Sequence, residues 1–324
     1  MKLTSFKKYF FVFGLLSCVH FAFALDKLKI GVFPASSSVP FYIASERGYF
    51  KDEGLEVEGI PMNTHQIQVQ ALVAGEIDGC ANLVTLEAAN INQRRPDTVT
   101  FISLNGANSK YLTEQFLVSN VGPYSSIKSL KELKGAKILV APGPANVFAA
   151  KASLKAVGLE DVKDYTMTEQ AMGIHVGAIL AGSFDAAYTL EPVASMIVKQ
   201  SAGKRIEGGV IATYILGKAD ALAYVAGGAL AVKLITEKPD VAQRYAKAWA
   251  RAVKDVATDP KARDYLTKFQ VPADMTATIP LAKLTMLSEF KANDYADFQK
   301  FINFGVDTGL VKGPIDVKTF VKSY

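Results

Sequence analysis

The chain has 324 residues, half of them hydrophobic, which predicts a packed globular protein with one large domain or two smaller ones. It carries 36 basic and 31 acidic residues, but Lys2, Lys7 and Lys8 precede the first acidic residue, and without them 33 basic residues face 31 acidic ones. A net charge of about +2 excludes the strongly basic surface that binds nucleic acid.

The first 24 residues have the pattern of a secretory signal peptide. The basic segment MKLTSFKK precedes the apolar run YFFVFGLLSCVHF, and small residues around Ala24 predict cleavage after that residue. The run is shorter than the roughly 20 apolar residues that span a membrane. The pattern therefore predicts export to the periplasm, with a lipoprotein anchored at Cys18 as the alternative.

After cleavage the chain keeps one cysteine, Cys80, so an internal disulfide is excluded. Cys80 stands in the apolar run IDGCANLV, which is typical of a buried thiol rather than a reactive one.

Strands and helices alternate along the chain that follows the leader. The apolar run at 27–33 predicts a strand, the spacing at 39–54 predicts a helix that begins at Pro40, and LEVEGI at 55–60 predicts a second strand. This order is typical of an α/β fold with mostly parallel sheets flanked by helices.

Two segments of the chain are repeated at nearly the same spacing. KIGVFPASSSV at 29–39 is similar to KILVAPGPANV at 137–147, and ALVAGEIDGCANLVTLE at 71–87 is similar to AILAGSFDAAYTLEP at 178–192. In each copy of the second segment a glycine, Gly75 or Gly182, is placed to end a helix. The repeat predicts two lobes built on one plan.

The chain must then cross between the lobes twice, near Tyr111–Gln115 and near Gly217–Tyr224. This predicts one lobe from 25–113 plus 222–324 and a second from 114–221. The last third of the chain is mostly helical, and the apolar spacing around Trp249, the only tryptophan, places that residue in the core.

Ligands of open α/β sheets bind beyond the carboxyl ends of the strands, in a cleft. The residues near these strand ends are therefore the candidates for ligand binding: Ser36, Ser37, Ser38, Phe41, Thr85, Gly143, Asn146, Tyr188 and Glu191. Among them, Phe41 and Tyr188 are expected to enclose the ligand with apolar surface. Three of the candidates have an alternative role as helix caps: Ser38 for the first helix, Thr85 for the helix that it precedes, and Glu191 for the helix after Pro192.

Patterns of catalytic and metal-binding residues are missing from the sequence. His65 and His175 have no second ligand at helical spacing, and there is no phosphate-binding glycine loop and no G-x-S-x-G motif. The sequence therefore predicts a binding protein without a cofactor or a metal, rather than an enzyme.

Several segments in order resemble a known family: LKIGVFPASSSVPFYIASERGYFKDEGLEVE, ALVAGEIDGCANL, SIKSLKELKGAKILVAPG, AILAGSFDAAYTLEP and ALAVKLITEKPDVAQRYAKAWARAV. They are similar to the solute-binding proteins of ABC importers for aliphatic sulfonates, taurine, nitrate and thiamine pyrimidine precursors. The resemblance covers the chain from about Leu28 to its end.

The resemblance implies a two-lobed periplasmic-binding-protein fold of type 2, with the ligand cleft between the lobes. It also implies that the protein hands a small polar solute or oxyanion to an ABC permease at the inner membrane. We expect the protein to be a monomer. The family's pocket segments fall on 36–41, 83–85, 143–146 and 188–191.

These segments contain no Arg or Lys, so a neutral or amine-bearing solute with Glu191 as counter-charge is an alternative to an oxyanion. Relatives of the same fold include enzymes of pyrimidine and menaquinone precursor synthesis. A receptor that presents its ligand to a membrane sensor is a further alternative.

Overall fold

The computed structural model describes residues 25–324. The predicted signal peptide, including its cleavage site after Ala24 and the alternative lipid site at Cys18, lies outside these residues. Within them, none of the helices combines the length and the apolar character that a membrane span requires.

The first of two sheets has seven strands in the order β12-β5-β11-β3-β1-β2, with β4 also paired to β11. β1 runs parallel to β2 and β3, whereas β11 is antiparallel to β3, β4 and β5. The strands are β1 Asp26–Val32, β2 Leu55–Pro61, β3 Gly79–Val84, β4 Val99–Phe101, β5 Ser103–Ala107, β11 Ala223–Ala231 and β12 Lys283–Met286.

The second sheet has five strands in the order β10-β6-β9-β7-β8. β7 is parallel to β8 and β9, and β6 is antiparallel to β9 and β10. The strands are β6 Glu114–Ser119, β7 Lys137–Val140, β8 Thr166–Glu169, β9 Ala186–Leu190 and β10 Gly203–Gly208.

Both sheets are thus mixed, and parallel pairing is confined to the strands joined through helices. The antiparallel strands β6 and β11 are the first strands after the chain passes from one sheet to the other. No crossover helix joins them to a neighbouring strand, so parallel pairing is not required there. The predicted α/β architecture is confirmed, with fewer parallel neighbours than the alternation of strands and helices indicated.

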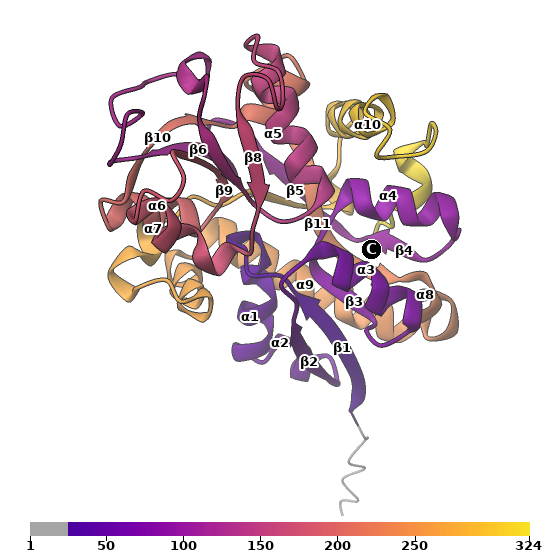
Figure 1. Ribbon diagram of the computed structural model, residues 1–324. Coiled ribbons are helices and arrows are strands. Elements are labelled where there is room, and N and C mark those ends of the chain that lie inside the picture. Colours follow the sequence, from indigo (N-terminus) through magenta and orange to yellow (C-terminus); the bar gives the residue numbers. More distant parts are fainter. Residues whose placement is uncertain (1–24) are drawn as a thin grey trace, which may run out of the picture.

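Helices cover both faces of each sheet (Figure 1). We call the first sheet with its helices the first lobe, and the second sheet with α5 to α7 the second lobe. The helices of the first lobe are α1 Val39–Glu46, α2 Tyr49–Asp52, α3 His65–Ala74, α4 Thr85–Arg94, α8 Val232–Glu237, α9 Pro239–Thr258 and α10 Ala292–Asp307. Those of the second are α5 Pro144–Ala156, α6 His175–Leu180 and α7 Val193–Lys199.

The helix expected over 39–54 is broken between α1 and α2. Gly48 adopts φ 75°, a left-handed conformation that glycine takes without strain and that a continuing α-helix cannot contain. The chain then turns into α2, where Phe50 still packs into the core between the first sheet and α9.

The cores follow the alternation of side chains along the strands. In β6, Phe116 and Val118 face α5, whereas Leu117 between them faces α6 and α7. In the first lobe, Trp249 of α9 is buried and donates a hydrogen bond from Nε1 to Ser103 Oγ at 2.9 Å, which confirms its predicted place in the core. Cys80 is fully buried as well, and this burial raises the pKa of its thiol.

The internal repeat is confirmed at the level of single hydrogen bonds. The amide of Lys29 on β1 donates to Asp78 Oδ2, before β3, at 2.8 Å, and the amide of Lys137 on β7 donates to Asp185 Oδ2, before β9, also at 2.8 Å. Each aspartate amide in turn donates to the carbonyl of its lysine, at 2.7 and 2.9 Å. In both lobes, therefore, the same pair of hydrogen bonds joins the first strand of the repeat to the aspartate that precedes its parallel neighbour.

Residues 108–113 lead from the first sheet to the second, and residues 209–222 lead back. The two connections lie against each other: Gly209 has φ 67°, and a Cβ atom there would stand 2.3 Å from the amide nitrogen of Ser109. Asn108 Nδ2 also donates to the carbonyl of Asp220 at 3.3 Å. The lobe borders after residues 113 and 221 stay a prediction.

Candidate ligand-binding site between the lobes

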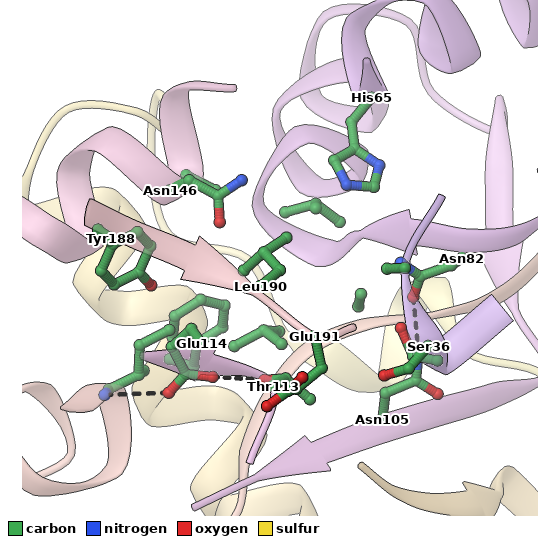
Figure 2. A pocket seen from close by; sticks show the side chains of 18 residues that line it. Ser36, His65, Asn82, Asn105, Thr113, Glu114, Asn146, Tyr188, Leu190 and Glu191 are labelled. Carbon is green, nitrogen blue, oxygen red and sulfur yellow. Dashed lines mark hydrogen bonds between the residues drawn. The ribbon is translucent and has the colours of Figure 1, made fainter. Parts of the chain in front are cut away.

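A cavity lies where the two lobes meet, with a volume of about 50 Å³ for the centres of water molecules. The first lobe contributes residues that follow β1 or belong to β3 and β5, and the second contributes residues of β6, α5 and β9. Figure 2 labels ten of the residues that line it: Ser36, His65, Asn82, Asn105, Thr113, Glu114, Asn146, Tyr188, Leu190 and Glu191.

Five of the nine predicted site residues line this cavity: Ser36, Ser37, Asn146, Tyr188 and Glu191. They come from both lobes, so the structure brings together side chains that are up to 155 positions apart in the sequence. Their contact with a ligand remains a prediction. The other four, Ser38, Phe41, Thr85 and Gly143, are outside the lining.

Ser38 neither lines the cavity nor caps α1. Its hydroxyl donates to the carbonyl of Phe33 at 2.7 Å and forms no bond with the amides of the helix. The prediction of a cap is wrong because Ser36–Ser38 already form a 3₁₀ turn, which leaves Ser38 with helical angles (φ −82°, ψ −3°) instead of the extended angles of an N-cap.

Phe41 and Thr85 have structural contacts instead. Phe41 is buried beside Phe50, and its ring covers Gly59, where a Cβ atom would stand 2.6 Å from Phe41 Cε1. Thr85, the first residue of α4, donates from its hydroxyl to the carbonyls of Tyr224 and Val225 at 2.9 and 3.2 Å. This threonine therefore ties α4 to β11 and does not cap the helix.

Glu191 combines both roles that the sequence left open. It lines the cavity, is 1% exposed, and accepts hydrogen bonds from the amide and hydroxyl of Ser195 in the first turn of α7 at 3.1 and 3.0 Å. It also accepts from Gln115 Nε2 at 2.5 Å and pairs with Arg205 at 3.3 Å. Burial raises the pKa of this carboxyl, and the bonds from Gln115 and Ser195 and the charge of Arg205 counteract that rise.

Several polar cavity residues were missed by the sequence analysis, among them Asn82, Asn105 and Glu114 at the start of β6. Of these, Glu114 is the one with an ionisable side chain. Glu114 is 1% exposed, and its carboxyl accepts from the amide of Ile211 at 3.4 Å and from the hydroxyl of Thr113. Burial raises its pKa. The available signal was an acidic residue two positions before the apolar run FLVS, at the point where the chain changes lobes.

The wall from the first lobe holds neutral polar groups. Asn105 of β5 donates to Asn82 Oδ1 of β3 at 2.7 Å. His65 stacks on Phe33 with 4.1 Å between ring centroids, and its Nδ1 lies 2.9 Å from Gln68 Oε1. Burial lowers the pKa of His65 to about 4, so its imidazole is neutral at pH 7. Residues 25–324 hold no group of three His, Cys, Asp or Glu side chains suited to a metal ion.

The start of α5 beside the cavity is already occupied by carboxylates. The amide of Ala145 donates to Glu87 Oε1 of the first lobe at 3.3 Å, and the amide of Gly143 donates to Glu169 Oε1 at 3.1 Å. Burial is the main reason that the pKa of Glu87 rises to about 7, and the nearby charge of Glu169 adds to it. Gly143 thus lies beside Asn146 without lining the cavity, with φ 109°.

A family model described as NMT1/THI5 like matches residues 35–263. The alkanesulfonate-binding protein SsuA from Xanthomonas axonopodis pv. citri, bound to MOPS, is a similar solved structure with a TM-score of 0.73 and 17% identity; the match covers 94% of this chain and 100% of that one. The periplasmic aliphatic sulphonate-binding protein SsuA from Escherichia coli has a TM-score of 0.68 and 16% identity, with 92% of both chains covered.

The periplasmic nitrate-binding protein NrtA from Synechocystis PCC 6803 has a TM-score of 0.70 and 16% identity, with 91% of this chain and 84% of that one covered. No curated protein sequence matches this chain. At these identities the likeness establishes a shared two-lobed periplasmic-binding-protein fold, as the sequence predicted, and not a shared ligand.

Proposed function

Because the chain belongs to the NMT1/THI5-like family, we propose that it is an extracytoplasmic solute-binding protein that captures a small polar solute between its lobes and passes it to an ABC permease. One observation carries this proposal: a cavity is lined by polar side chains of both lobes, and within residues 25–324 only two connections join those lobes. The similarity in fold to sulfonate-binding and nitrate-binding proteins supports it.

The mechanism follows from this placement of the polar groups. A solute that touches Asn82 and Asn105 on one side and Asn146 and Tyr188 on the other makes its full set of contacts only when the lobes are together. It therefore stabilises the closed arrangement by the difference in contacts between the two states. The connections at 108–113 and 209–222 are the places where the chain would bend.

The function needs no chemical step on the solute. The cavity residues named above can hydrogen-bond and orient a ligand, and burial keeps the Cys80 thiol protonated. We propose that the protein acts in the periplasm as a monomer, after removal of residues 1–24.

Native mass spectrometry of the purified protein tests the proposal first, because a tightly held solute would be carried through purification and appear as a defined mass increment. A thermal-shift panel of small anions, cations and neutral heterocycles follows. At a hundredfold excess over its dissociation constant, a ligand should add about 2.7 kcal/mol to the free energy of unfolding. If no solute co-purifies and no compound raises Tm, the proposed function is wrong; turnover of a bound compound would indicate an enzyme instead.

A further inference from the structure

Tyr188 presents a buried hydroxyl to the cavity without a protein partner. The residue, on β9, is fully buried, and its Oη finds no hydrogen-bond partner within residues 25–324. Figure 2 shows the ring at the cavity beside Glu114, whose charge raises the pKa of this hydroxyl further than burial alone. A buried hydroxyl left unpaired is costly, so a bound group that hydrogen-bonds to it would gain affinity there.

Glu114 beside it is a buried carboxyl without a counter-charge. Its partners are a hydroxyl and an amide, and it forms no salt bridge in the part of the chain that the structure describes. Glu191 differs, because Arg205 lies 3.3 Å from it. Burying a carboxylate is costly unless a cation compensates it, and an opposite charge nearby favours the ionised form.

The cavity is poorly suited to an anion. Among the described residues, none of those that line it is Lys or Arg. Three of the helix starts at the cavity, where an oxyanion could bind, already hold carboxylates of the chain: Glu87 at α5, Glu191 at α7 and Glu114 at the π-helical turn Ile211–Ile215. At these three starts an oxyanion would be repelled by the carboxylate that the amide already binds.

We propose that the solute is a small organic cation whose protonated nitrogen binds between the Glu114 carboxylate and the Tyr188 hydroxyl. This inference rests on the proposed solute-binding function and names the class of solute. The nitrogen donates to Glu114 Oε and to Tyr188 Oη, and the Asn82–Asn105 pair on the opposite wall contacts the rest of the molecule.

Matched pairs of probes of opposite charge test this class. Ethanolamine and isethionate share a two-carbon hydroxyl skeleton, and guanidinium and nitrate are both planar with threefold symmetry. Each is added at millimolar concentration to the purified mature protein at pH 7 and constant ionic strength, and Tm and the dissociation constant are measured. We expect a cation to raise Tm and to bind at least tenfold more tightly than its anionic counterpart.

Variants then locate the binding group. Glu114→Gln keeps the shape and the acceptor for Ile211 but removes the charge, and we expect it to weaken the best cation about tenfold or more. Tyr188→Phe removes only the unpaired hydroxyl, so it should fold normally and weaken the same cation severalfold. Glu207→Gln on β10 and Tyr165→Phe are matched controls outside the cavity lining, and we expect both to leave the affinity unchanged.

The outcomes separate this inference from the proposed function. Binding of isethionate or nitrate in preference to the cations, or an anionic co-purified solute, overturns the inference and leaves solute binding intact. Wild-type affinity for a cation in Tyr188→Phe, together with wild-type affinity in a folded Glu114→Gln, overturns the assigned position. Absence of any bound solute or Tm shift overturns both proposals.

Discussion

Three carboxyl groups at the interface of the lobes, those of Glu87, Glu114 and Glu191, are buried and have raised pKa values. Each accepts a hydrogen bond from an amide at the start of a helical segment, so each position serves the fold as well as the cavity. They differ in what neutralises the negative charge: Arg205 is paired with Glu191, and we propose that the solute neutralises Glu114.

Glu87 gives the stability a defined pH dependence. Its pKa rises from 4.5 to about 7 on folding, so the folded state binds the extra proton between these values. Its contribution is present below pH 4.5 and is lost as the pH rises through 7, by about 3 kcal/mol in all. We expect Glu87→Gln, which stays neutral and keeps an acceptor for Ala145, to match the wild type at pH 4.5 and to exceed its free energy of unfolding at pH 8, measured with urea.

His65 and His175 change the stability with pH in the opposite direction. Because Glu87→Gln and the wild type both contain these histidines, the difference between the two proteins isolates the contribution of Glu87. Burial lowers the pKa of both histidines, so their contribution is lost as the pH falls. Glu132→Gln is the control: hydrogen bonds from Lys128 and Ser129 lower the pKa of Glu132, so its effect should be equal at pH 5 and pH 8. A pH profile of Glu87→Gln parallel to that of the wild type would contradict the prediction.

At the scale of elements, the hydrogen bonds of Asp78 and Asp185 predict that the losses of unfolding free energy at these two sites are additive. Asp78→Ala and Asp185→Ala each remove one acceptor, for Lys29 and Lys137, and each should cost about 1 kcal/mol of unfolding free energy. Because the two sites share no partner, the double variant should cost the sum of the two single variants within about 0.5 kcal/mol. The matched variants Asp78→Asn and Asp185→Asn keep an acceptor oxygen and should lose less. Urea denaturation of all five variants checks this, and a strongly non-additive double variant would be inconsistent with independent lobes.

The elements also mark what the sequence could and could not predict. The repeat predicted the two lobes correctly because Gly75, Gly182, Asp78 and Asp185 act locally, each within one turn or one strand pair. Ser38 was wrongly predicted as a cap because the hydrogen-bond partner of its hydroxyl depends on the 3₁₀ turn at 36–38, which the spacing of apolar residues in the sequence does not reveal. Glu114 was missed because its exposure and its partner Ile211 depend on packing between segments 97 positions apart.

At the scale of the molecule, the contact between the two connections should control how the lobes are held. Gly209→Ala places a Cβ atom 2.3 Å from the Ser109 backbone and imposes a left-handed φ on alanine. Gly217→Ala, in the same connection, imposes a similar φ of 70° but meets nothing within 4 Å, so it measures the backbone strain alone, about 1–2 kcal/mol. We expect Gly209→Ala to lose clearly more stability and to enlarge the radius of gyration in small-angle scattering. Equal effects of both variants would mean that the contact does not restrain the lobes.

The strand order of the first sheet has a consequence for the order in which the protein is completed. β11 lies between β5 and β3, so β5 and β12 join β1, β2 and β3 only through a strand that begins at Ala223. All strands of the second sheet, in contrast, come from residues 114–208 and can pair as soon as that stretch has emerged. Since a chain folds from its N-terminus as it is made, the lobe that begins first is finished last, around a neighbour that is already formed.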